Sequence, residues 1–210
     1  MRSFALVCWP FILLVCHDDT ASQKLTRHEH AASSCRLAAL ATRRVAPTVS
    51  IMKVRPSAPA DAKAIAALIA SFQPLLTLSP NGTGAEQYFA SVSEEAELQY
   101  LQIPRYTYYV AERNDSIVGF IAMRDTTHLF HLFVATAYQR QGIARTLWCQ
   151  ALKHATQTHN ATHFTVNSSL AAIPVYERFG FTPSGPEVQA LGIAFLPMTL
   201  KLKSNAQLKP

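Results

Sequence analysis

Hydrophobic and polar positions follow regular patterns over most of the chain from residue 52 onward. After Met52 a short extended run reaches Pro59, a residue favoured in the first turn of a helix, and a helical spacing follows. Four apolar residues share one face of this predicted helix, namely Ile65, Leu68, Ile69 and Phe72. Residues 73–104 contain a loop-like stretch, LSPNGTG, and one or two expected helices, and their pattern is the least regular.

The segment after Arg105 is rich in β-branched and aromatic residues. Residues 106–113 (YTYYVAER) and 116–124 (SIVGFIAMR) flank Asn114-Asp115, a pair that favours a tight turn. A third apolar run, 128–134 (HLFHLFV), follows closely. Because consecutive strands joined by short turns usually pair with each other, these runs predict an antiparallel meander.

A helical spacing returns between Gly142 and about Thr158, with an apolar stripe made of Ile143, Leu147, Ala151, Leu152 and Ala155. The next strand, 163–167 (HFTVN), is separated from 128–134 by this helix, so the two strands should be parallel through a right-handed crossover. A helix over 171–179 follows, with Gly180 in the left-handed position that ends it, and then a strand over 193–203. The predicted fold class is α/β (α+β), with a mixed, mostly antiparallel central sheet.

Residues 1–51 differ in character from the domain at 52–210. Residues 4–16 form an apolar run too short to span a bilayer but long enough for the core of a signal peptide. His17 and two aspartates then stand where small residues should mark cleavage, and residues 20–50 are rich in Ala, Ser, Thr and Arg, as in a transit peptide. Three interpretations stay open: a functional start at Met52, an export or anchor segment, and an organellar leader.

Charge and cysteine content narrow the partners of the domain. Residues 1–51 carry six Lys/Arg and three acids and residues 52–210 carry thirteen and ten, so each part has a net charge of only +3, without a basic stripe. This argues against nucleic acid as a partner. Cys149 is the only cysteine after residue 51, which favours a reducing, cytoplasmic location. No His or Cys set has metal-ligand spacing, so we expect no metal, and we expect no membrane contact by the domain.

The stretch YQRQGIARTL, residues 138–147, connects a strand to a helix. Gly142 and Ala144 leave the first helical turn open, and the unpaired N–H groups there form a site suited to an anion. An ordinary strand-to-helix turn fits the local sequence equally well. A dinucleotide fingerprint would need a small residue where Leu147 stands, and no Gly-Lys-Ser/Thr of a Walker loop is present.

Two motifs, Q-x-x-G-x-A at 139–144 and YERFGF at 176–181, follow the predicted hairpin and third strand in order. With them the domain resembles the GNAT superfamily of acyl-CoA-dependent N-acetyltransferases. The resemblance implies helices on both faces of the sheet and a parallel strand pair splayed at the acetyl-CoA site. It implies that the coenzyme A pyrophosphate binds at Gln139, Arg140, Gln141, Gly142, Ile143, Ala144 and Arg145. It further implies that Leu132, Phe133 and Val134 pair with the pantetheine arm.

The same resemblance assigns catalytic roles. Tyr176 takes the place of the general acid, although a core aromatic residue would have the same pattern. His128 occupies the strand position where histone-modifying members place a glutamate base, although it could be an ordinary strand histidine. Many members have Asn where this chain has Ser169, so the contact to cofactor or acceptor passes to Ser169, Asn167 or Ser168.

Other reactive side chains have simpler interpretations. On a regular strand His131 faces away from His128 and is structural. Cys149 lies roughly 10 Å along the helix from the anion site, so buried packing is preferred over an acyl-enzyme role. Glu94, Glu95 and Glu97 are expected on a solvated helix face rather than in a site that attracts a cation.

Taken together, the residues and the resemblance predict an N-acetyltransferase that transfers acetyl from acetyl-CoA, its co-substrate, to an amine of a small molecule, peptide or protein. Direct attack in a ternary complex is expected, with the acceptor between residues 72–104 and the loop 183–192. The alternative is a non-catalytic acetyl-CoA sensor. The oligomeric state stays open, with a homodimer as one alternative.

Overall fold

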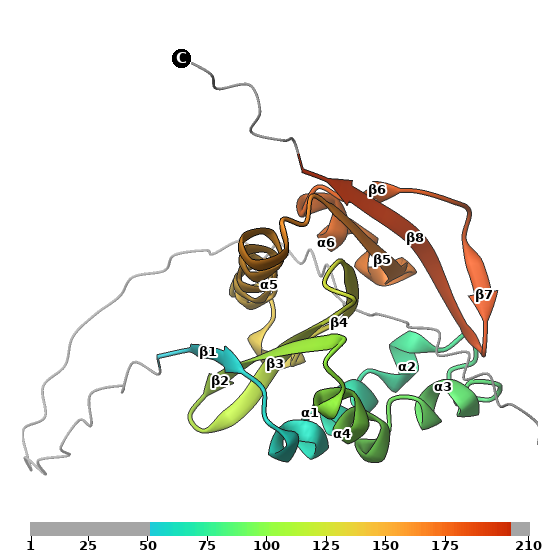
Figure 1. Ribbon diagram of the computed structural model, residues 1–210. Coiled ribbons are helices and arrows are strands. Elements are labelled where there is room, and N and C mark those ends of the chain that lie inside the picture. The colour runs from blue at the N-terminus through green and yellow to red at the C-terminus, as the bar shows by residue number, and fades with distance from the viewer. Residues whose placement is uncertain (1–50, 203–210) are drawn as a thin grey trace, which may run out of the picture.

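The computed structural model describes residues 51–202, so the expectations for residues 1–50 lie outside the described residues. The helices pack around one sheet (Figure 1). The strands are β1 (Lys53–Pro56), β2 (Tyr106–Arg113), β3 (Ser116–Arg124), β4 (His128–Val134), β5 (His163–Ser169), β6 (Thr182–Pro183), β7 (Val188–Ala190) and β8 (Ile193–Lys201). The α-helices are α1 (Ala62–Ala70), α2 (Gln73–Leu76), α3 (Glu86–Ala90), α4 (Glu94–Gln102), α5 (Ile143–His159) and α6 (Ile173–Arg178). Short 3-10 helices are η1 (Pro59–Asp61), η2 (Thr136–Tyr138) and η3 (Leu170–Ala172).

The sheet has eight strands in the order β1-β2-β3-β4-β5-β8-β6, and β7 pairs with β8 beside this path. Strands β2, β3 and β4 form the predicted antiparallel meander. Asn114 and Asp115 both have positive φ at the first hairpin, as a type I′ turn requires. The predicted parallel pairing of β4 with β5 is also present, so the mixed, mostly antiparallel fold class is confirmed.

Strands β4 and β5 separate soon after they meet. They pair only at His128 with Thr165 and at Leu129 with Val166, and beyond these residues they diverge. A bulge interrupts β4 at the same place, because Met123 of β3 pairs with Leu129 whereas its neighbour Ala122 pairs with His131. The splayed parallel pair is therefore confirmed, and the bulge occurs where the splay begins.

The bulge corrects the prediction for His131. His128 and His131 pair with Arg124 and Ala122, which lie two residues apart on β3 and thus on one face of the sheet. The extra residue in β4 reverses the alternation of side chains, so His131 faces the same side as His128 instead of the opposite one.

Helices cover both faces of the sheet, as predicted. In Figure 1, α5 lies on one face and α1 and α4 lie on the other. The predicted face of α1 is buried, and the α5 stripe is buried apart from a half-buried Leu152. No helix within residues 51–202 has the length and hydrophobicity needed to cross a membrane.

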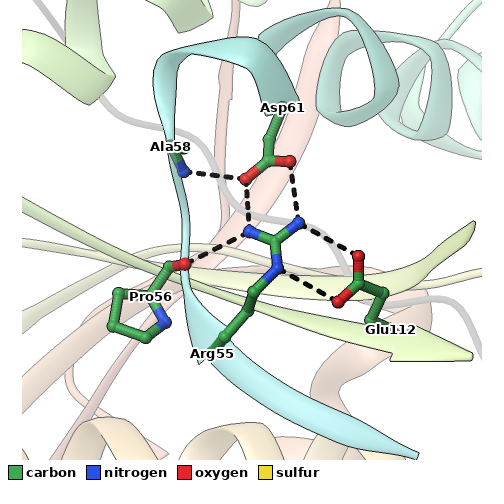
Figure 2. Close-up of polar contacts among 5 residues, drawn as sticks. All are labelled: Arg55, Pro56, Ala58, Asp61 and Glu112. Atoms are coloured by element: carbon green, nitrogen blue, oxygen red, sulfur yellow. Dashed lines mark hydrogen bonds and ion pairs between the residues drawn. The ribbon is translucent and has the colours of Figure 1, made fainter. Parts of the chain in front are cut away.

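Arg55 joins β1 to the start of α1 and to β2 (Figure 2). Its guanidinium donates two hydrogen bonds to Asp61, at 2.7 and 3.0 Å, and two to Glu112, at 3.1 and 3.2 Å. The Asp61 carboxylate also accepts the backbone N–H of Ala58 at 2.7 Å. Hydrogen bonding to Arg55 lowers the pKa of both carboxyls. This bidentate geometry fixes the first strand and the first helix against the sheet.

The irregular segment 73–104 has two helices, α3 and α4, after the LSPNGTG stretch, as predicted, and a further short helix, α2, before it. It contacts the far end of the chain: Thr77 forms a β-bridge with Ile193, and the Leu78 N–H donates to the Gly192 carbonyl at 2.8 Å. The segment 183–192, expected as a loop, contains β7. Neither feature has a local signal, because both depend on contacts between residues far apart in sequence.

Candidate active site

The loop between β4 and α5 has an unusual backbone. Arg140 and Gly142 both have positive φ, of 58° and 81°, and α5 begins directly after Gly142. The side-chain amide of Gln139 donates to the Val134 carbonyl at 3.0 Å and holds the loop on the end of β4. The first N–H groups of α5 have no partners inside the helix and point out of its positive end. We call residues 139–145 the cradle.

A cavity of about 480 Å³ lies in front of the cradle. Six of the seven predicted pyrophosphate residues line it, namely Gln139, Arg140, Gly142, Ile143, Ala144 and Arg145, and so does Val134. Gln141 is absent from the lining because its side chain bonds elsewhere, to Arg113 and the Ala137 carbonyl. Leu132 and Phe133 are also absent, since both side chains are buried in the core.

The cavity extends beyond the predicted residues. Its other walls come from α5 and α6 and from the residue before the cradle, and they are formed by Tyr138, Trp148, Cys149, Leu152, Val175, Arg178 and Phe179. Residues three or four apart share one face of a helix, so the spacing of Ala144 or Arg145 with Trp148 and Leu152 indicates from the sequence that this face of α5 forms one wall. The α6 wall has no such signal, because it requires knowing that α6 packs beside α5.

Gly142 fits a bound anion in two ways. A Cβ placed on it would meet no atom within 4 Å, so the space in front of its backbone is open. Its φ of 81° is also a conformation that other residues adopt only with strain. The cradle therefore allows close approach to backbone N–H groups, and Arg140, Arg145 and Arg178 border the same cavity.

His128 lies where β4 and β5 begin to separate. Its Nδ1 is 2.8 Å from Thr165 Oγ1 on β5, and its Nε2 is buried with no hydrogen-bond partner among the described residues. Burial, followed by the nearby Arg124, lowers the pKa of His128 to about 4. The imidazole is thus neutral at pH 7, with one nitrogen unpartnered.

Tyr176 and Ser169 contribute two further buried polar atoms. Tyr176 is 0% exposed, its ring packs against Phe179 and Phe181, and its hydroxyl has no partner within residues 51–202. Burial raises the pKa of Tyr176 well above 10. Ser169 Oγ is likewise buried and unpartnered in this region, whereas Ser168 Oγ donates to the Ser169 carbonyl and Asn167 is half-buried. Buried polar atoms without partners are uncommon, and they fit a ligand that completes them.

The prediction that Cys149 is buried is wrong. The thiol is exposed and lines the cavity. Cys149 lies about 200° around the helix from Leu147, which places it off the apolar stripe. Its neighbour Trp148 fills the interior instead, against Phe164, Phe179 and Phe181.

The solvated-face prediction is correct for Glu94 and Glu95 and wrong for Glu97. Glu97 is 0% exposed; its Oε2 accepts the hydroxyl of Tyr108 at 2.9 Å, and its Oε1 lies 3.2 Å from Nε2 of the fully buried His131. That second contact has an ion-pair distance without hydrogen-bond geometry. Because burial of a carboxylate is costly, this group needs both partners.

Two loops expected to flank the acceptor touch each other. A Cβ on Gly192 would lie 2.4 Å from the backbone carbon and oxygen of Gly84, so the turn before β8 packs directly on the loop before α3. With the Thr77–Ile193 bridge, this contact joins the α2–α3 segment to the β7–β8 hairpin. Within residues 51–202 no group of three or more His, Cys, Asp or Glu residues has the arrangement of a metal site.

Comparisons with known proteins agree with this geometry. A family model described as an acetyltransferase (GNAT) domain matches residues 76–202. A GCN5-related N-acetyltransferase of Rhodopseudomonas palustris has a TM-score of 0.59 at 22% identity, over 73% of this chain and 97% of the other. The PaiA N-acetyltransferase of Thermoplasma acidophilum, solved with coenzyme A, has a TM-score of 0.60 at 15% identity, over 72% and 99% of the two chains.

A spermidine N-acetyltransferase variant of Vibrio cholerae is also similar, with a TM-score of 0.52 at 17% identity over 71% of this chain and 93% of the other. These structural matches share the overall fold of this chain. Since the family model covers more than half of the chain, the sequence belongs to the GNAT family of acetyltransferases.

Proposed function

We propose that this chain transfers the acetyl group of acetyl-CoA to an amine, by direct attack while both substrates are bound. Acetyl-CoA would supply the thioester that the amine attacks. The observation that carries the proposal is the cradle with its cavity, which reaches Val134 at the end of β4, the strand that diverges from β5. An anion at the start of α5 and an extended chain between two diverging strands suit this arrangement.

The cradle would hold the pyrophosphate through the backbone N–H groups from Gln141 to Arg145, with Arg140, Arg145 and Arg178 balancing its charge. Beyond Leu129 strand β4 has no described strand partner on its β5 side. The backbone on this side of β4 at Leu132 and Phe133 is therefore available for the pantetheine arm, although both side chains are buried in the core, whereas the Val134 carbonyl already accepts the Gln139 amide. A backbone N–H there would stabilise charge on the thioester carbonyl.

His128 would act on the amine. A base with a pKa of about 4 is far too weak to remove a proton from a free ammonium ion, whose pKa is near 10.4. The amine must therefore arrive neutral, and the unpartnered Nε2 would accept its proton as the carbon–nitrogen bond forms and the nitrogen becomes acidic.

Tyr176 would act on the sulfur. Its raised pKa keeps the phenol protonated, so the hydroxyl is a hydrogen-bond donor without an acceptor. An alkyl thiol has a pKa near 8.5, so complete proton transfer from Tyr176 is uphill in the free protein. Donation of a hydrogen bond to the departing sulfur is the role that suits this group best.

The acceptor would lie between the α2–α4 segment and the β7–β8 hairpin, which are close together in Figure 1. The spermidine N-acetyltransferase among the similar structures makes polyamines the first candidates to assay. At 17% identity that likeness guides the choice of amines and identifies none of them.

The test measures thiol release from acetyl-CoA by the full chain across polyamines, amino acids and peptides with free N-termini. Binding of CoA should stabilise the protein by about 2.7 kcal/mol at a hundredfold excess over its Kd, and at least one amine should give turnover. Initial-rate lines should intersect, and Cys149→Ser should keep kcat. Stabilisation without turnover by any amine would favour a sensor, whereas parallel lines and an inactive Cys149→Ser would indicate an acyl-enzyme.

A further inference from the structure

We infer that Arg113, at the end of β2, is a positioning residue for the cradle. Arg113 donates from Nη1 to Oε1 of Gln141 at 3.0 Å, and its guanidinium lies 5.6 Å from the ring centre of Tyr138. The two contacts flank Gln139 and Arg140 on either side. Arg113 therefore reaches the loop from a strand that lies 28 residues earlier in the chain.

The cradle needs such support because its backbone is strained. Arg140 has a φ of 58°, a conformation that costs a residue with a side chain free energy unless its surroundings impose it. The bonds from Gln139 to Val134 and from Gln141 to Ala137 are local to the loop. Among the described residues, Arg113 is the one side chain outside the loop that hydrogen-bonds Gln141, and it thereby ties the loop to the sheet.

Arg113 does not line the cavity, and neither does Gln141. An effect of Arg113 on CoA binding would thus pass through the loop rather than through contact with the phosphates. The guanidinium suits this role because its planar fork bonds Gln141 while its face lies over Tyr138, and a lysine ammonium would not reproduce that arrangement. The inference rests on the proposed function, because it assigns Arg113 to the pyrophosphate end of the proposed acetyl-CoA site.

The experiment compares the full chain with Arg113→Met, Gln141→Ala and the double variant. We expect Arg113→Met to raise the Kd of CoA about tenfold and Gln141→Ala to raise it less, about threefold. The double variant should raise the Kd by less than the product of the two single effects, because Arg113 and Gln141 share a hydrogen bond. Arg105→Met is the matched control: it removes an exposed arginine of the same hairpin, paired with Asp125, and should leave the Kd unchanged.

A second readout separates positioning from general loss of structure. Arg113→Met should raise the KM of acetyl-CoA while kcat, the acceptor KM and the rate with S-acetyl-N-acetylcysteamine, a thioester without the nucleotide, stay unchanged. Equal losses with both thioesters would overturn the inference, as would an Arg113→Lys variant that binds CoA like the parent, because charge alone would then suffice. If the parent itself fails to bind CoA, the proposed function fails; if the parent binds and Arg113→Met matches it, only this inference fails.

Discussion

The cradle and the region around α4, which we call the α4 side, are held in place by different kinds of contact. The cradle is held mostly by bonds between near neighbours, such as Gln139 to Val134 and Gln141 to Ala137, and Arg113 adds a hydrogen bond from a strand distant in sequence. The α4 side depends on long-range contacts: Glu97 with Tyr108 and His131, and the turn at Gly192 with the loop at Gly84. The conformation of the cradle therefore depends mostly on a short stretch of sequence, while the contacts of Glu97 and Gly192 depend on the complete fold.

The largest effect should come from the buried Glu97 side chain on the α4 side. Glu97→Ala leaves His131 and the Tyr108 hydroxyl buried without their partner, and we expect a loss of about 3–5 kcal/mol in the free energy of unfolding. Urea denaturation measures it. Gln99→Ala, exposed on the same helix, should change stability by less than about 0.5 kcal/mol. A loss below about 1 kcal/mol for Glu97→Ala would mean that the pair is not a structural requirement.

Tyr176→Phe should separate chemistry from binding at the splayed strands. Removal of the hydroxyl should lower kcat about 100-fold if it donates to the sulfur, and should leave the Kd of CoA unchanged. Stability should not fall, because the hydroxyl is buried without a described partner. Steady-state kinetics and thermal unfolding of one preparation measure both effects. Unchanged kcat would assign Tyr176 to the core alone.

A titration of the free energy of unfolding against pH tests the lowered pKa of His128. The folded pKa of about 4 is below the unfolded value of 6.5, so the unfolded chain takes up the proton first and stability falls as pH decreases through this window. The His128 contribution between pH 7 and pH 5 should be a loss of about 2 kcal/mol. The carboxyls of Asp61 and Glu112, whose pKa values are lowered, contribute below this range.

The His128→Asn variant is the control for this titration. Between pH 7 and pH 5 its free energy of unfolding should decrease less than that of the parent, and the difference should be the about 2 kcal/mol assigned to His128. A parent and variant with parallel curves would mean that the folded imidazole binds protons as readily as the unfolded one.

The smallest effect should follow from the contact between the two loops. Gly192→Ala adds a methyl group 2.4 Å from the backbone of Gly84, and Gly84→Ala imposes similar strain at positive φ with only a 4.0 Å contact. We expect Gly192→Ala to be the less stable by more than about 1 kcal/mol and to raise the acceptor KM, with no change in the Kd of CoA. Equal stability of the two variants would show that the loops separate easily.

Much of the fold could be predicted because the signals are local. The hairpin at Asn114-Asp115, the strand 128–134 and the end of α6 at Gly180 agree with the predictions at or near their boundaries. The strand-to-helix loop of the cradle also has a local signal, because Gly142 stands directly before the first residue of α5.

The remaining features depend on contacts that a local pattern does not contain. No Gly or Pro marks the β4 bulge at Leu129–His131, so the face of His131 could not be read from alternation. Glu97 lies in a polar helix, and its burial depends on Tyr108 and His131 from two other strands. Cys149 is exposed because its neighbour Trp148 packs inward against Phe179, a contact that the sequence of α5 alone does not show.

The most direct test of the cradle is a calorimetric titration of CoA into the parent and into Gly142→Glu. The glutamate would force a side chain into a backbone at φ 81° and place a negative charge at the positive end of α5. We predict a Kd raised at least about 100-fold, while Gly185→Glu, in the loop after β6 where φ is not positive, binds like the parent. Equal affinity of Gly142→Glu and the parent would contradict the assignment of the pyrophosphate to the start of α5.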